Sequence, residues 1–222
     1  MNAVAATPAQ VLFRSPNWVG DAILAVPAIE ALREAFPAAR LSALAVPWVG
    51  DVFRFVPAVD EVVRFDRKGR HRGFLGTERL ARELRARRLD LAVTFPRSAS
   101  SAWLLWRSGA RERLGYAGTA PRGWLTLPVR FPGKGRPGHH ELELHLGLVR
   151  GLGLAAPVRA PRLAVPGELR ARREELLRAS GLDGRAYLAV APGAAFGVRS
   201  AGPPRGSPRC ATPRAKSAGS RR

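Results

Sequence analysis

Several residue types that would define a class of protein are scarce in this chain. Its 222 residues include one cysteine, Cys210, which excludes an internal disulfide and a cysteine-rich metal site within them. No apolar run approaches the roughly 18 residues of a membrane span, and residues 1–10 lack the basic start and apolar core of a secretion signal. We therefore expect a cytoplasmic protein.

Lysine is also scarce, although the formal net charge is +20. Only three of the 37 basic residues are lysine (Lys68, Lys134 and Lys216), and the others are arginine. This skew indicates GC-rich codon usage more than a surface selected for binding phosphate. Neither an RNP-type aromatic motif nor zinc-finger spacing accompanies the charge, so we expect no specific nucleic-acid partner. Peripheral attraction to an anionic membrane surface fits the same charge without any motif.

The residues that are present predict an α/β fold with a mainly parallel sheet. Short apolar runs alternate with segments of helical periodicity, at the spacing of right-handed crossover units. The expected strands are 11–13, 41–46, 61–65, 89–95, 113–116 and 125–131. The expected helices are 21–36, opened or bent by Pro27, then 48–56, 75–88, the segment after Ser98, 139–152 and 168–179.

The stretch from Val11 to Asp21 places a short strand directly before a polar turn and a helix. Pro16 and Asn17 end the strand, and Gly20 lets the backbone come close to whatever lies above the sheet. Asp21 occupies an N-cap position, for which aspartate is among the best residues. Open α/β sheets bind ligands outside the carboxyl ends of their strands, so Asp21 is either a helix cap or a catalytic group.

Other polar turns and the histidines suggest further contacts. Arg97 and Ser98 follow the strand 89–95 at the same edge of the sheet. Residues 186–190 read as a buried strand that leads into Pro-Gly-Ala-Ala, a turn suited to offering backbone N–H groups to a phosphate. His139 and His140 are adjacent and cannot both face one metal from a helix, so we expect no metal site.

Four motifs closely resemble the lipopolysaccharide heptosyltransferases of glycosyltransferase family 9, with the heptosyltransferase II branch nearest. They are R-S-P-N-W-V-G-D-A-I-L-A-V-P-A at 14–28, F-P-R-S-A-S-S-A at 95–102, L-G-Y-A at 114–117 and A-P-G-A-A-F-G at 191–197. The similarity runs in order from Val11 to Gly197, and S-P-N-W-V-G-D is its most specific part. It shifts the interpretation of Asp21 toward catalysis.

The resemblance implies a GT-B fold, in which two Rossmann-like domains face each other across a cleft. It implies transfer of heptose from ADP-heptose to the lipopolysaccharide core with inversion, no cofactor and no required metal, at the cytoplasmic face of the inner membrane. Asp21 then matches the proposed general base. The other site residues carried over are Asn17, Trp18, Gly20, Arg97 and Ser98 for the acceptor, and Pro192, Gly193 and Ala194 facing the donor phosphate.

The chain departs from the family after Gly197, where relatives continue with K-R-W-P and a donor-binding domain. Residues 198–222 hold seven basic residues and no acidic one. One possible codon assignment, read in a shifted frame, restores R-W-P-P, so we hypothesise a frameshift near Val198. We expect an acceptor domain at residues 1–156 and a connector with an interdomain helix at 157–185. Residues 186–197 would begin a donor domain whose remainder is essentially missing, and residues 198–222 would form a disordered basic tail.

On this interpretation the chain is an inactive fragment of an inverting heptosyltransferase. Two alternatives stay open at the level of sequence. One is a cationic, non-catalytic module that binds a membrane surface or nucleic acid, which is supported only by charge. The other is a nucleotide-binding α/β enzyme of another kind, which is supported only by topology.

Overall fold

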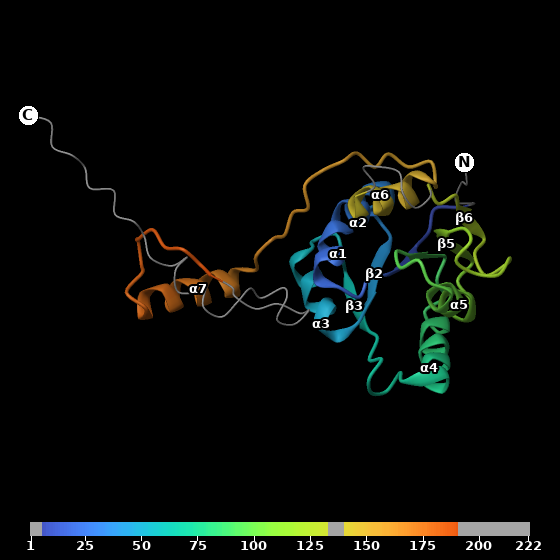
Figure 1. The fold of residues 1–222 in the computed structure, drawn as a ribbon, viewed down its shortest axis with the longest axis horizontal. Helices are drawn as coiled ribbons and strands as arrows, with labels where there is room; N and C mark the ends of the chain where they lie inside the picture. The colour runs from blue at the N-terminus through green and yellow to red at the C-terminus, as the bar shows by residue number, and fades with distance from the viewer. Residues whose placement is uncertain (1–5, 133–139, 191–222) are drawn as a thin grey trace, which may run out of the picture. The chain divides into compact units, whose positions relative to one another are not determined.

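A computed structural model describes residues 6–132 and 140–190 of the chain. The chain divides after Pro166 into two units, which are considered separately. The first unit contains a sheet covered by helices on both faces, and residues 167–190 of the second contain one helix, α7 (Gly167–Ala179). Figure 1 traces both units in the order of the sequence.

The sheet has six strands in the order β3-β2-β1-β4-β5-β6, and every pair of neighbours is parallel. The strands are β1 (Gln10–Arg14), β2 (Arg40–Ala45), β3 (Glu61–Arg64), β4 (Leu91–Thr94), β5 (Glu112–Tyr116) and β6 (Leu127–Val129). The strand order reverses between β1 and β4, which is where doubly wound sheets open a crevice for ligands. The predicted parallel α/β sheet is therefore confirmed.

Two apolar layers enclose the sheet because successive side chains of each strand point to opposite faces. On β1, Val11 and Phe13 pack in one layer and Leu12 in the other. The first layer includes α1 (Val19–Leu24), α2 (Val26–Ala35) and α6 (Glu141–Arg150), and the second includes α4 (Gly73–Arg85) and α5 (Ala99–Arg107). Figure 1 shows these two groups on opposite sides of the sheet. Helix α3 (Pro47–Gly50) and the 3-10 helix Asp51–Phe55 extend the first layer.

The helix after β1 is interrupted, as predicted, near Pro27. Helix α1 ends at Leu24, and α2 begins at Val26 with Pro27 in its first turn, where the missing N–H costs no intrahelical bond. The predicted cap was wrong: the N-cap of α1 is Trp18, and Asp21 is the third helical residue. The helix begins at Val19, two residues before the expected position. The carboxylate of Asp21 is thereby left without a capping role.

The connector from 157 to 166 lies with the first unit. Arg159 forms an ion pair with Glu34, and the Ala164 N–H donates to the Phe55 carbonyl oxygen at 2.7 Å. In the second unit α7 has no buried residue. The strand expected at 186–190 does not form, because within the described part of the chain no strand pairs with its backbone; Leu188 is 79% exposed.

Three predicted features lie outside the described residues: the turn at 191–197, the basic tail at 198–222 and the start of the helix at His139. Among the helices that are described, none is both long and apolar enough to cross a lipid bilayer.

Candidate functional site

Two cavities open at the carboxyl edge of the sheet, where the order of the strands reverses. The turns after β1 and β4 contribute to both of them, and Asn17 lines both. We call the cavity of about 590 Å³ the Asp21 pocket and the cavity of about 700 Å³ the Arg14 pocket. Their position at the switch point of the sheet follows directly from the topology.

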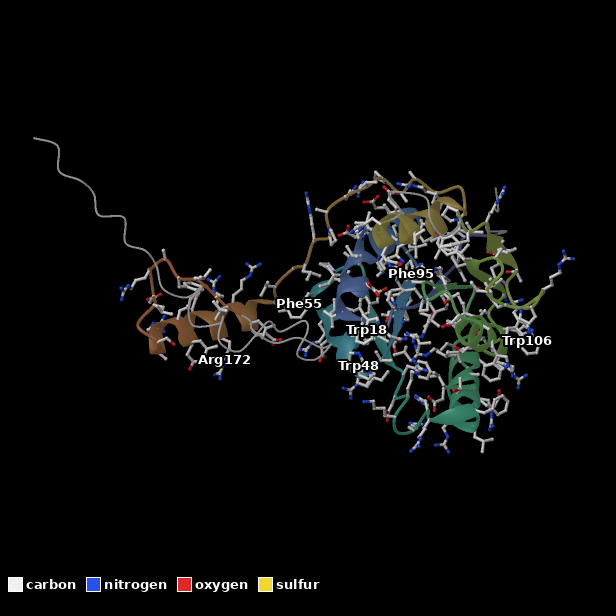
Figure 2. All side chains as sticks on the ribbon, in the orientation of Figure 1. Trp18, Trp48, Phe55, Phe95, Trp106 and Arg172 are labelled. Atoms are coloured by element: carbon white, nitrogen blue, oxygen red, sulfur yellow. The ribbon has the colours of Figure 1, made fainter. Side chains whose placement is uncertain are left out.

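Helices α1 and α6 and the turns after β1 and β4 contribute side chains to the Asp21 pocket. Asn17 and Trp18 come from the turn after β1, Asp21 from the first turn of α1, and Arg97 from the turn after β4. Glu141 and His145 reach it from α6, with Ala117, Gly118, Thr119 and Phe131 along the remaining wall. Trp18, which is labelled in Figure 2, is 53% exposed and also lines the pocket. The pocket therefore combines charged side chains with aromatic ones, including an exposed tryptophan.

The carboxylate of Asp21 is half-buried and has no fixed partner. It forms neither a hydrogen bond nor an ion pair with any side chain or backbone group of the described residues. Burial raises the pKa of Asp21 above its usual range, and the negative charge of Glu141 raises it further, while Arg97 opposes both effects. A carboxylate with these properties can accept a proton from a bound hydroxyl group.

Arg97 and Glu141 form a two-pronged ion pair beside Asp21. The Arg97 Nη1 and Nη2 atoms donate to the Glu141 Oε2 and Oε1 atoms at 3.0 and 2.9 Å. The guanidinium also lies over the Phe131 ring, 5.4 Å from its centroid. One N–H on each terminal nitrogen of Arg97 remains for a ligand, because each carries two. The pair holds the charge of Arg97 in place at the wall of the pocket.

His145 is a pocket residue that the sequence analysis missed. It is 3% exposed, its ring meets the Phe95 ring edge-on at 5.0 Å, and its Nε2 atom has no hydrogen-bond partner among the described residues. Burial lowers the pKa of His145 to about 4, so the ring is neutral at physiological pH. The signal in the sequence was its place on the buried stripe of α6, between Leu142 and Val149.

The Arg14 pocket lies in the second layer, on the other side of Asn17. Its polar lining is Arg14, Asn17, Arg67, His71, Thr77, Ser98, Ser100 and Ser101, and its apolar lining includes Phe65, Phe74, Leu104 and two tryptophans, Trp103 and Trp124. Arg14 is 2% exposed and was not predicted as a site residue. A charged residue at the end of the apolar strand 11–13 was the signal that could have revealed it.

The residues predicted to bind the acceptor do not all lie in the same pocket. Asn17, Trp18, Asp21 and Arg97 come together in the Asp21 pocket. Ser98 instead lines the Arg14 pocket, where its hydroxyl oxygen accepts from the Ser101 N–H at 3.3 Å and caps α5. Gly20 is exposed on α1 and lines neither pocket, so its role stays a prediction.

The residues predicted to face the donor phosphate and the predicted absence of a metal site relate differently to the described part of the chain. Pro192, Gly193 and Ala194 lie outside the described residues. Within residues 6–132 and 140–190, no group of three or more His, Cys, Asp or Glu side chains is placed to hold a metal ion. His140 caps α6 through its ring nitrogen, which accepts from the Leu142 N–H at 3.3 Å.

The fold resembles solved glycosyltransferase structures. The glycosyl transferase family 9 protein from Veillonella parvula superposes with a TM-score of 0.69 at 22% identity, over 82% of this chain and 52% of that one. E. coli ADP-heptose LPS heptosyltransferase II gives 0.62 at 21%, over 79% and 51%, and E. coli heptosyltransferase WaaC with ADP gives 0.54 at 18%, over 68% and 49%. No protein-family profile and no curated sequence matches the chain.

The chain spans about half the length of these structures. At these identities the likeness shows a shared fold. The predicted fold class is confirmed: the chain has the α/β architecture of one half of a GT-B glycosyltransferase.

Proposed function

We propose that this chain is the acceptor-binding half of an inverting glycosyltransferase of family 9. In the complete enzyme, heptose would pass from ADP-heptose to the inner core of lipopolysaccharide. The proposal joins the sequence motifs around Asp21 to the shared fold with the Veillonella and E. coli transferases. It places the protein in the cytoplasm, at the inner face of the inner membrane, where its positive charge would favour contact with anionic lipid.

The observation that carries the proposal is the free carboxylate of Asp21 in a pocket at the switch point of the sheet. When an acceptor hydroxyl attacks the anomeric carbon of the donor, its oxygen forms the new glycosidic bond and loses a proton. We assign that proton to Asp21, while the bond from the sugar to the ADP oxygen breaks and ADP leaves as an anion. A carboxylate within hydrogen-bond reach of the hydroxyl is suited to this role, and a raised pKa improves it as a base.

Donor binding belongs to the other half in this proposal. The leaving ADP gains negative charge and needs cations or N–H groups close to it. Pro192, Gly193 and Ala194 are proposed to begin that surface, and no bound metal is part of the scheme. Positioning donor and acceptor together is worth about 7–11 kcal/mol of the barrier, so we expect no measurable transfer from these 222 residues alone.

The test compares this chain with a version whose coding DNA is read in the shifted frame from Val198 onward. Both are offered ADP-heptose and heptosylated core acceptor, and product is measured by mass spectrometry. We expect product only from the frame-shifted version. Equal activity in both would contradict the division into halves, and no product from either would contradict the assignment to heptosyl transfer.

In the active version, Asp21→Asn should lower turnover by about 10²-fold or more with folding intact, which is the usual scale of general base catalysis. The matched control is Asp51→Asn, which removes an exposed carboxylate that lines neither pocket. Circular dichroism checks folding. Unchanged turnover in Asp21→Asn would remove Asp21 from the mechanism.

A further inference from the structure

Arg14 is a buried cation that has no counter-ion in the part of the chain that the structure describes. Only 2% of its surface is exposed, and it forms no ion pair with any carboxylate of the described residues. Its terminal nitrogens donate to uncharged oxygens only: the Ser15 and Leu44 carbonyls and the Asn17 side-chain amide. The Nε atom has no partner within the same described set.

Burial of an uncompensated charge is costly, and the surroundings of Arg14 increase that cost. Burial, together with the positive charge of Arg67, lowers the pKa of Arg14 to about 9. The guanidinium still carries its charge at neutral pH. Both guanidiniums lie over the Phe65 ring, at 5.1 and 5.7 Å from its centroid. Two cations with no acid between them leave a positive potential that an anion would relieve.

The N-terminus of α5 faces the same space. This helix, nine residues long, begins at Ala99, and its first three residues line the cavity. A helix N-terminus carries a partial positive charge, although in α5 the Ser101 N–H is already capped by Ser98. The Ser98 and Thr77 hydroxyls also line the cavity, but they donate to the Ser101 hydroxyl and to the Gly73 carbonyl oxygen. Among residues 6–132 and 140–190, no aspartate or glutamate lines this cavity, whereas Asp21 and Glu141 line the neighbouring one. The two cavities beside Asn17 therefore have opposite electrostatic character.

We propose that the Arg14 pocket binds a phosphate monoester carried by the acceptor. The positive charge decides in favour of phosphate: three terminal oxygens and a charge near −2 match two guanidiniums and a helix N-terminus better than one carboxylate does. The aromatic wall of Phe74 and Trp103, whose rings are 5.4 Å apart, provides an apolar surface for the sugar that bears the phosphate. Phosphate binding itself is argued from the pocket alone, and only the identity of the molecule that carries the phosphate rests on the proposed function.

The test titrates the full 222-residue chain with inorganic phosphate at constant ionic strength and follows backbone amide resonances by NMR. We expect saturable shifts at residues 99–101. Arg14→Gln should weaken binding at least tenfold, and Arg67→Gln about threefold or more. Arg67 is exposed, so its variant keeps the fold even if Arg14→Gln does not. The matched control Arg79→Gln removes an exposed arginine of α4 that lines neither pocket, and its affinity should be unchanged.

Three results would overturn the inference: no saturable shift at residues 99–101, equal affinity for acetate, or equal weakening by Arg79→Gln. Asp21→Asn should leave phosphate binding unchanged. Phosphate binding without transfer in the frame-shifted enzyme would overturn only the proposed function. Transfer without phosphate binding would overturn only this inference.

Discussion

At the scale of single residues, Arg97 and Glu141 act on Asp21 with opposite sign although they are paired with each other. Glu141 raises the pKa of Asp21 and Arg97 lowers it, with burial as the largest effect. The ion pair thereby fixes two opposing charges at one wall of the pocket. Because each partner partly neutralises the other, removing either one leaves the full charge of the remaining partner acting on Asp21.

This arrangement predicts two shifts in opposite directions. Glu141→Gln should lower the pKa of Asp21, because a negative charge is lost and Arg97 is left unneutralised. Arg97→Gln should raise it for the converse reason. NMR titration of the Asp21 side-chain carbon in this chain measures both, with Glu143→Gln as the control at an α6 position outside the pocket. Shifts of the same sign in both variants would contradict the geometry of the pair.

Residues whose role depends on what surrounds them were the hardest to predict. Asp21, Asn17, Trp18 and Arg97 could be selected from motifs because each follows the end of a strand. Their assembly in one pocket is a consequence of the parallel sheet. Whether Asp21 was a helix cap or a free carboxylate could not be decided from spacing, because the helix began earlier than its capping residues suggested.

At the scale of elements, the glycine at position 20 of α1 is expected to affect helix stability and ligand binding in opposite ways. A Cβ atom added at Gly20 would meet no protein atom within 4 Å, and the residue is exposed and helical. Packing within the protein therefore gives no reason for glycine at this position. The sequence motif predicts that a ligand approaches the backbone here, next to Trp18 and Asp21, although Gly20 itself lines neither pocket.

We therefore expect Gly20→Ala to stabilise the fold and impair transfer. The gain should be about 0.5–1 kcal/mol, from the better helix propensity of alanine. Urea denaturation measures the gain, and acceptor KM in the frame-shifted enzyme measures the loss. Gly167→Ala is the control, because it also opens a helix with free space around its Cβ position. If Gly20→Ala leaves KM unchanged, no ligand approaches Gly20.

Glu61 links the edge strand β3 to two neighbouring elements. Its carboxylate accepts from Arg87 at 2.7 and 2.9 Å and from Arg40 at 3.0 and 3.2 Å. The hydrogen bonds from Arg87 are the main reason that the pKa of Glu61 falls from 4.5 to about 2. A lowered pKa in the folded state stabilises the protein at pH values above the unfolded pKa, and the effect is lost as pH falls through the folded value.

Glu61→Gln should therefore lower the free energy of unfolding by about 1–2 kcal/mol at pH 7. The difference from wild type should shrink as pH falls from about 4.5 toward about 2. Denaturant titrations across this range measure it. Glu175→Gln, in an ion pair that is more than 60% exposed on both sides, should change little at any pH. A Glu61→Gln effect that is independent of pH would indicate lost packing instead of lost charge.

Most elements could be predicted from periodicity and from proline positions. The strands β1, β2 and β4 follow from local sequence because burial on both faces leaves continuous apolar runs, whereas β3 at the edge is only partly buried. The break in the helix after β1 follows from Pro27 itself. The segment 186–190 is equally apolar and forms no strand, since a strand requires a neighbour and local sequence cannot supply one. That is the physical limit of prediction from local pattern.

At the scale of the whole molecule, the charge of +20 predicts weak and nonspecific binding to DNA. Residues 198–222 carry seven of the 37 basic residues, so deleting them should remove much of the affinity. Binding should also fall steeply with salt and show no preference among duplex sequences. Salt-titrated fluorescence anisotropy measures both. Sequence-selective binding that survives the deletion would support the cationic binding module over the transferase.

Asn17 lines both cavities, and under the proposed function this would give the turn after β1 a part in regioselectivity. A substrate anchored by a phosphate on one side of Asn17 would present a hydroxyl to Asp21 on the other. The distance between the two cavities would then select the reacting hydroxyl, because only a hydroxyl at that distance from the phosphate can lose its proton to Asp21. The position of the new glycosidic bond on the acceptor would be set by this half of the enzyme, before the donor sugar arrives.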